Sequence, residues 1–146
     1  MFVPPYHLIF KHLGSDPKKG GPSDDVIVPR KLLDFLLRRL LEHVDFDETQ
    51  YLRCNPDVVT AIEKREMRSG REHFIQVGYF EGRIGGIPVQ EDWYLARNPD
   101  VAAAKRARKV ESAEMQYRIA GASEWRQPNA RSANDVDAWK SVMEQT

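Results

Sequence analysis

Histidine and cysteine are the side chains of this sequence best suited to hold a metal or to act as a base or nucleophile. There are four histidines and one cysteine, Cys54, in 146 residues. The histidines are His7, His12, His43 and His73. None forms an H-x-x-x-H pair, and Cys54 has no second cysteine at the spacing of a zinc site. The sequence also lacks G-x-G-x-x-G, the P-loop pattern and G-x-S-x-G. We therefore expect no metal, no cofactor and no catalytic residue, and we predict that the protein is not an enzyme.

Carboxylates and arginines recur at one fixed distance. Asp57 precedes Arg83 by the same number of residues as Asp100 precedes Arg126. No two carboxylates are marked out as a general acid and its base. We predict instead that each aspartate pairs with its arginine within the chain, an exposed tie that contributes little stability.

A basic run is the candidate for contact with phosphates or acidic protein. It consists of Lys105, Arg106, Arg108 and Lys109. Across the chain, however, 22 basic residues balance 22 acidic ones, and the net charge is zero. Because nucleic-acid binders usually carry net positive charge, we expect the run to be a solvated helix face and keep weak nucleic-acid binding as a second alternative.

These side chains belong to a repeated frame. Residues 46–83 align without gaps to residues 89–126, which follow 43 positions later, and 13 of the 38 aligned residues are identical. The identical positions of the first copy are Glu48, Tyr51, Leu52, Asn55, Pro56, Asp57, Val58, Ala61, Arg65, Ser69, Gly78, Glu81 and Arg83. A period of this length is typical of stacked helical repeats. Recurring aromatic residues are expected in the core of each copy.

Two tryptophans do not recur. Trp93 stands where the first copy has Gln50, and Trp125 stands where it has Gly82. Such residues either pack one copy against its neighbours or form a contact surface. If they form a surface, they are our candidates for binding a protein or a sugar ring.

Each copy is predicted to form three short helices. An Asp47 cap with Gln50 reaching back as its capping-box partner would begin the first helix. The second helix is predicted to begin at the structural caps Asn55 and Asn98, each of which is followed by proline. Carboxylates in the first turn, Asp57 and Asp100, support this start. Ser69 and Ser112 are predicted to cap the third, which would end at Gly78 or Gly121 in the left-handed conformation.

An amphipathic helix precedes the repeats. From Pro29 to Val44, apolar residues cover about half the circumference, and Phe35 lies outside that arc. This face is interpreted as a central core helix, with a self-association surface that includes Leu37 and Leu40 as the sharper hypothesis and peripheral membrane contact as a third. Phe35 is a separate candidate for contact with a partner. Before it we expect a short helix, 6–13, and a flexible linker. After the repeats, Asn134 could cap a last short helix.

The repeated frame resembles a bacterial tandem repeat, Y-L-x-x-N-P-D-V followed by G-x-x-E-G-R, found beside or within glycosyltransferases and surface proteins. The resemblance covers residues 46–126, and it departs at Gln116 and Trp125, where the repeat has histidine and glycine. It implies a fold rather than a chemistry. A link to a cell-surface or polysaccharide pathway is implied by association.

The sequence thus predicts an all-α protein of five parts: 1–25, 26–45, 46–88 (first repeat), 89–128 (second repeat) and 129–146. We expect a non-catalytic interaction module with a protein partner, self-associating as a homo-oligomer. The alternative is a carbohydrate-binding module that uses exposed tryptophans for a glycan. One cysteine, no evident secretory signal and no long apolar run predict a cytoplasmic protein without a transmembrane segment.

Overall fold

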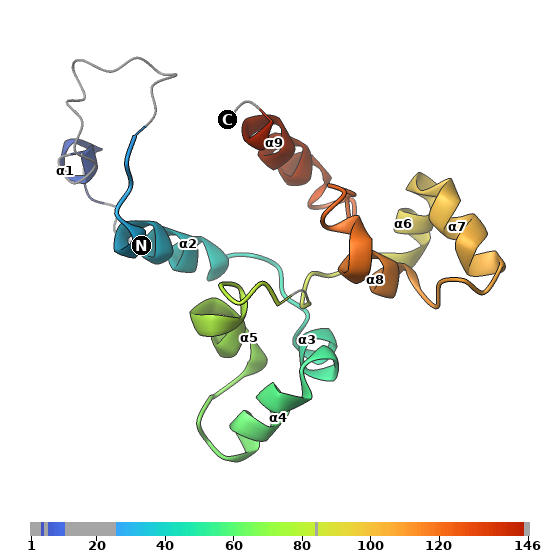
Figure 1. The fold of residues 1–146 in the computed structure, drawn as a ribbon, viewed down its shortest axis with the longest axis horizontal. Helices are drawn as coiled ribbons and strands as arrows, with labels where there is room; N and C mark the ends of the chain where they lie inside the picture. The colour runs from blue at the N-terminus through green and yellow to red at the C-terminus, as the bar shows by residue number, and fades with distance from the viewer. Residues whose placement is uncertain (1–3, 5, 11–25, 84, 145–146) are drawn as a thin grey trace. The chain divides into compact units, whose positions relative to one another are not determined.

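The structure, a computed structural model, describes residues 4, 6–10, 26–83 and 85–144. Within this part every regular element is a helix, which confirms the all-α prediction. None of the described helices is long and apolar enough to cross a membrane. The chain divides into two compact units, Met1–Val44 and Asp45–Thr146, which are described separately (Figure 1). The linker predicted over residues 14–25 lies outside the described residues.

The described residues of the first unit form two helices, α1 (Tyr6–Phe10) and α2 (Arg30–Leu41). α2 begins directly after Pro29 and ends three residues earlier than the predicted Val44. Only Leu41 of α2 is buried. Three of its six leucines are exposed and two are half-buried, which is not the burial expected of a central core helix.

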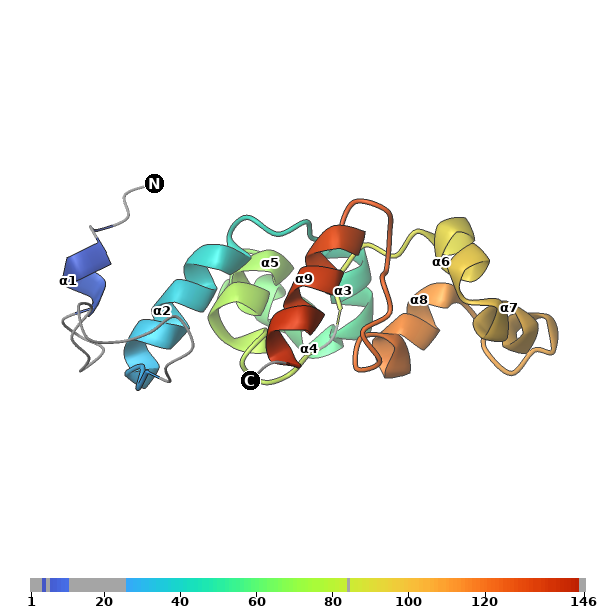
Figure 2. The same ribbon diagram turned by 90° about the horizontal axis from the view of Figure 1, so that it is seen from above.

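The second unit repeats one set of elements. The first set is α3 (Glu48–Cys54), α4 (Pro56–Glu63), α5 (Gly70–His73) and the π-helical turn η2 (Phe74–Gly78). The second set is α6 (Glu91–Arg97), α7 (Pro99–Arg106), α8 (Ala113–Gln116) and η3 (Tyr117–Gly121). Each element of the second set begins 43 residues after its counterpart. Helices α3, α4 and α5 pack against one another, and α6 packs against α7 and α8 (Figures 1 and 2). A last helix, α9 (Ala133–Met143), follows.

The core of each copy is built on a recurring tyrosine. Tyr51 and Tyr94 are both 0% exposed. Tyr51 packs between Phe46, at a ring-centroid distance of 5.3 Å, and Phe74, at 5.5 Å. Tyr94 lies 5.9 Å from Tyr117 in an edge-to-face arrangement. The prediction that the recurring aromatic residues form the core is confirmed.

Helix starts follow the sequence in part. Ser69 Oγ accepts a hydrogen bond from Glu72 N at 3.0 Å, and Ser112 caps α8 in the same way. Asp47 accepts from Gln50 N at 2.9 Å. The reciprocal half of the capping box is wrong, because Gln50 Oε1 accepts from Gly86 N at 2.7 Å instead.

At the last helix, the predicted cap is also wrong. α9 begins after Ser132, so Asn134 lies inside the helix rather than at its cap. The turn before α9 is held by Asn129, whose Oδ1 accepts from Ser132 N at 3.0 Å. The start of α9 itself has no side-chain cap bond.

The second helix of each copy ends on an arginine in the left-handed conformation. Arg65 has a φ of 62° and Arg108 a φ of 58°. In the first copy, Arg65 N donates to Ile62 O and Glu66 N donates to Ala61 O, the pair of bonds of a Schellman motif. Glycine is usual at this position because a Cβ atom is strained there.

Candidate functional site

The polar residues that recur in the frame form one hydrogen-bonded network in the first copy. Asn55 Nδ2 donates to Tyr51 O at 2.8 Å. Asn55 Oδ1 accepts from Arg83 at 3.2 Å, and Arg83 also donates to Asp57 at 2.9 Å. Asn55 therefore stands at the predicted start of α4, but its side chain makes no cap bond and instead joins α3 to the end of the repeat.

The same network is present in the second copy. Asn98 Nδ2 donates to Tyr94 O at 2.8 Å, and Arg126 donates to Asn98 Oδ1 at 2.9 Å. Arg126 also holds both carboxylate oxygens of Asp100, at 2.9 and 2.8 Å. The predicted ion pairs of both copies are thus confirmed, whereas the predicted cap role of Asn98 is wrong, like that of Asn55.

Hydrogen bonds and burial shift the pKa values of the groups in this network. The hydrogen bond from Arg83 keeps the pKa of Asp57 below its usual value, and Arg126 does the same to Asp100. Burial raises the pKa of both Tyr51 and Tyr94 to about 12. Since efficient proton transfer needs a pKa near the working pH, these groups are poorly suited to acid–base chemistry near neutrality.

A recurring glutamate has a role that the sequence analysis did not assign. Glu48 on α3 accepts hydrogen bonds from Gly70 N at 2.5 Å and Arg71 N at 2.8 Å, at the start of α5. Its counterpart Glu91 accepts from Ala113 N at 3.0 Å, at the start of α8. A carboxylate at this point satisfies free N–H groups at the helix terminus. The identity of Glu48 between the copies was the available signal.

The two copies differ at the partner of the buried tyrosine. Tyr51 Oη lies 2.9 Å from Nδ1 of His73, which is buried, whereas Tyr94 Oη donates to Gln116. Burial is the main cause that lowers the pKa of His73. His73 is therefore a buried partner of the tyrosine whose charged form is disfavoured.

Gly78 and Gly121 lie beside these same hydroxyl groups. The helical turns η2 and η3 end at these glycines as predicted, but neither glycine has a positive φ, so the predicted left-handed conformation is wrong at both positions. A Cβ atom at Gly78 would lie far inside contact distance of Tyr51 Oη, and one at Gly121 would meet Tyr94 Oη. The left-handed residues are the later Gly82, with a φ of 72°, and its counterpart Trp125, with a φ of 56°.

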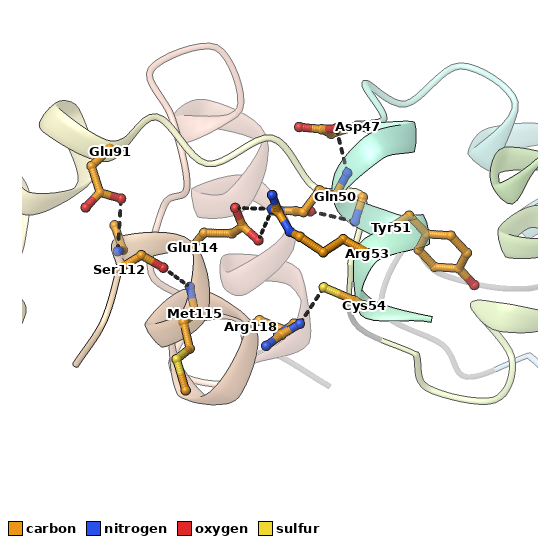
Figure 3. A network of polar contacts seen from close by, with 12 residues as sticks. Asp47, Gln50, Tyr51, Arg53, Cys54, Glu91, Ser112, Glu114, Met115 and Arg118 are labelled. Carbon is orange, nitrogen blue, oxygen red and sulfur yellow. Dashed lines mark hydrogen bonds and ion pairs between the residues drawn. The ribbon is translucent and has the colours of Figure 1, made fainter. Parts of the chain in front are cut away.

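Contacts between the copies come from α3 on one side and from α8 and η3 on the other. Arg53 donates to both carboxylate oxygens of Glu114 at 2.8 Å (Figure 3). Arg118 donates to the sulfur of Cys54, the free cysteine. The side chain of Arg53 is 62% exposed, so this ion pair is a surface contact.

The two candidate tryptophans, Trp93 and Trp125, lie in different environments. Trp93 on α6 is half-buried, and the guanidinium of Arg97 lies over its ring, 5.0 Å from the centroid. Trp125 is 37% exposed. One face of the Trp93 ring is thus already used within the chain.

The basic run divides into two parts. Lys105 is tied to Glu91 at 2.5 Å. Arg106, Arg108 and Lys109 are exposed at and beyond the end of α7. Lys105 and Arg106 also line an open depression between α6 and α7, which we call the α6–α7 groove. Its other lining residues are Leu95, Ala96 and Ala102.

The candidate residues of α2 lie on two sides of the helix. Leu40 is 49% exposed and follows Leu33 and Leu36, which are 41% and 44% exposed, at helical spacing. We call these three leucines the α2 stripe. Leu37 is half-buried, and Phe35, 57% exposed, points elsewhere because it lies outside the stripe's arc.

Within the described residues, no group of three or more histidine, cysteine, aspartate or glutamate side chains could hold a metal ion. Comparison of the chain with protein families, curated proteins and solved structures finds no match.

Proposed function

We propose that this protein is a non-catalytic helical interaction module that self-associates through the α2 stripe and docks a protein partner. The observation that carries the proposal is the use of the recurring polar residues. In both copies the asparagine, the aspartate and the arginine bind one another and the backbone of the first helix. Because these recurring side chains are hydrogen-bonded within the chain, we infer that they stabilise a scaffold and that binding takes place on its surfaces.

The α2 stripe supports the self-association. Leu33, Leu36 and Leu40 form a contiguous apolar line on a short helix, and each is more than two-fifths exposed. Apolar side chains at this spacing are the ones that a partner helix buries in helix–helix association. A second α2 offers the same line, as a two-fold symmetric contact requires.

The setting of the protein rests on two further features. Cys54 is a free thiol, which favours the cytoplasm, where thiols stay reduced. The resemblance of the repeated frame to a bacterial repeat beside glycosyltransferases is our reason to seek the protein partner in a cell-surface or polysaccharide pathway.

The test compares masses in solution. Light scattering coupled to gel filtration, over a concentration series, should give a mass above that of one chain for the wild type and a lower mass for Leu40→Glu. Lys31→Glu, an exposed charge change on the same helix, is the matched control and should keep the wild-type mass. A single-chain mass for the wild type at every concentration would refute self-association.

The partner is sought by affinity purification from the native host with mass spectrometry. The wild type should enrich specific proteins. A glycan array serves as the competing arm, because sugar binding that disappears in Trp125→Ala would favour the carbohydrate alternative over a protein partner.

A further inference from the structure

One lining residue of the α6–α7 groove, Ala96, has a counterpart that makes a contact between the copies. By the repeat frame, Ala96 and Arg97 correspond to Arg53 and Cys54 of the first copy. Those two residues contact Glu114 and Arg118 of the following copy. The side of the second copy that carries Ala96 and Arg97 therefore corresponds to a surface that packs against a helix in the first copy.

Stacking another copy head-to-tail on this surface is disfavoured by charge. The residues that would take the places of Glu114 and Arg118 are Arg71 and Ile75 of the first copy. Arg71 would approach a groove that is lined by Arg106 and by Lys105, which is paired with Glu91. The salt bridge of the internal contact would thus be replaced by like charges, which repel. The groove calls for an acidic, partly apolar helix.

α9 is a helix of that kind. Its apolar residues Val136, Trp139 and Met143 follow one another at helical spacing, and Trp139 is 46% exposed. Asp135 lies beside this line, and Asp137 and Glu144 add further negative charge against one lysine, Lys140. An apolar line bordered by carboxylates complements an apolar groove bordered by cations.

The start of α9 is tethered on the other side of the second copy. Asn129 Nδ2 donates to Pro88 O at 2.6 Å, in the segment that joins the two copies, and Arg131 pairs with Asp45 at 3.2 Å. The groove lies on the α6–α7 side, which in the first copy is the side that meets the next copy. The chain's own α9 therefore begins away from its own groove.

We propose that α9 of one molecule docks in the α6–α7 groove of a second molecule, with Trp139 against Leu95 and Ala102 and with Asp135 near Arg106. Reciprocal exchange gives a two-fold symmetric pair. The proposal rests on the self-association proposed above, but it uses a contact that does not involve α2.

The experiment uses full-length chains that carry Leu40→Glu, so that the α2 stripe cannot contribute. Sedimentation velocity should still detect a dimer. Adding Trp139→Ala should weaken it at least about tenfold, as expected for the loss of a central aromatic anchor. Arg106→Glu and Asp135→Arg should each weaken it as well, and combining the two should restore it, because the reversed charges again attract.

Controls and contrary outcomes separate the two proposals. Lys140→Ala, a change of an exposed charge on α9 outside the apolar line, should leave the dimer unchanged. A Leu40→Glu chain that is monomeric at all concentrations overturns the α9 contact and leaves the α2 contact standing. A Leu40→Glu dimer that Trp139→Ala does not weaken, or that the double charge reversal does not restore, also overturns it. All variants are checked for helix content by circular dichroism.

Discussion

Tyr51 Oη lies 2.9 Å from Nδ1 of His73, whereas the corresponding Tyr94 donates to an amide oxygen of Gln116. In each copy a buried phenol lies beside a glycine, but its partner is an imidazole, which can take up a proton, in the first copy and an amide, which does not ionise, in the second. This difference gives the first prediction.

His73 should make the protein sensitive to mild acid. Burial lowers the pKa of His73 in the folded chain below its ordinary value of 6.5. Over the pH range between the two pKa values, the unfolded chain therefore binds more protons at His73 than the folded chain does. The contribution of His73 to stability is fully present above the unfolded pKa and is lost as the pH falls through the folded pKa. In the wild type, the free energy of unfolding measured with urea should decrease as the pH is lowered from about 7 to about 5.

His73→Gln is the matched variant, because the second copy already uses glutamine at this place. The variant should keep the hydrogen bond to Tyr51 and show a weaker decline in stability with acid. Equal declines in both proteins would show that His73 does not carry the effect.

A substitution of Asn55 can show whether its side chain stabilises the protein as a bridge between α3 and Arg83 or as a cap of α4. Serine is as good a helix cap as asparagine, but its side chain is too short to reach both Tyr51 O and Arg83. If Asn55 served only as a cap, Asn55→Ser would be close to neutral. Because its amide joins α3 to Arg83, we expect a loss of about 1–3 kcal/mol in the free energy of unfolding by urea, the range for leaving a buried polar group unpaired.

Gly78 should not tolerate a methyl group unless the tyrosine hydroxyl is removed. A Cβ atom at Gly78 would overlap Tyr51 Oη, so Gly78→Ala should lower the free energy of unfolding by about 1–3 kcal/mol. Tyr51→Phe removes the overlapping atom and also loses the bond to His73. In a double-mutant cycle, measured by denaturant unfolding, Gly78→Ala should therefore cost less in the Tyr51→Phe background. Additive effects would contradict the overlap.

Arg65 should be replaceable by glycine with a gain in stability. Its φ of 62° strains an ordinary residue, and its side chain is exposed. Glycine removes a backbone strain of about 1–2 kcal/mol, which exceeds the cost of the larger conformational entropy that glycine gives the unfolded chain. We therefore expect a net gain of about 0.5–1 kcal/mol in the free energy of unfolding. Thermal unfolding should show a higher Tm for Arg65→Gly, while Arg65→Ala, which keeps the strain, should show no gain. Arg108→Gly provides a repeat of the experiment in the second copy.

The sequence by itself determined the features that depend on short stretches of chain or on the duplication. Helices α4 and α7 begin at their prolines, Ser69 and Ser112 cap the third helices, and the ion pair of Asp57 with Arg83 recurs in both copies. Propensity and capping act over a few residues, and the repeat frame showed which distant residues keep a constant separation.

Only the tertiary structure decided what the remaining recurring residues do. Asn55 stands at a helix start, but its side chain bridges two helices. Gly78 ends a helical turn, but it also makes room for a hydroxyl group. Glu48 holds a helix start 22 residues away. Each role depends on an atom brought near by packing, and a single sequence does not state which atoms packing brings together. The same holds for α2 and α9: their patterns predict amphipathic helices, but only the folded chain shows which of their apolar residues remain exposed.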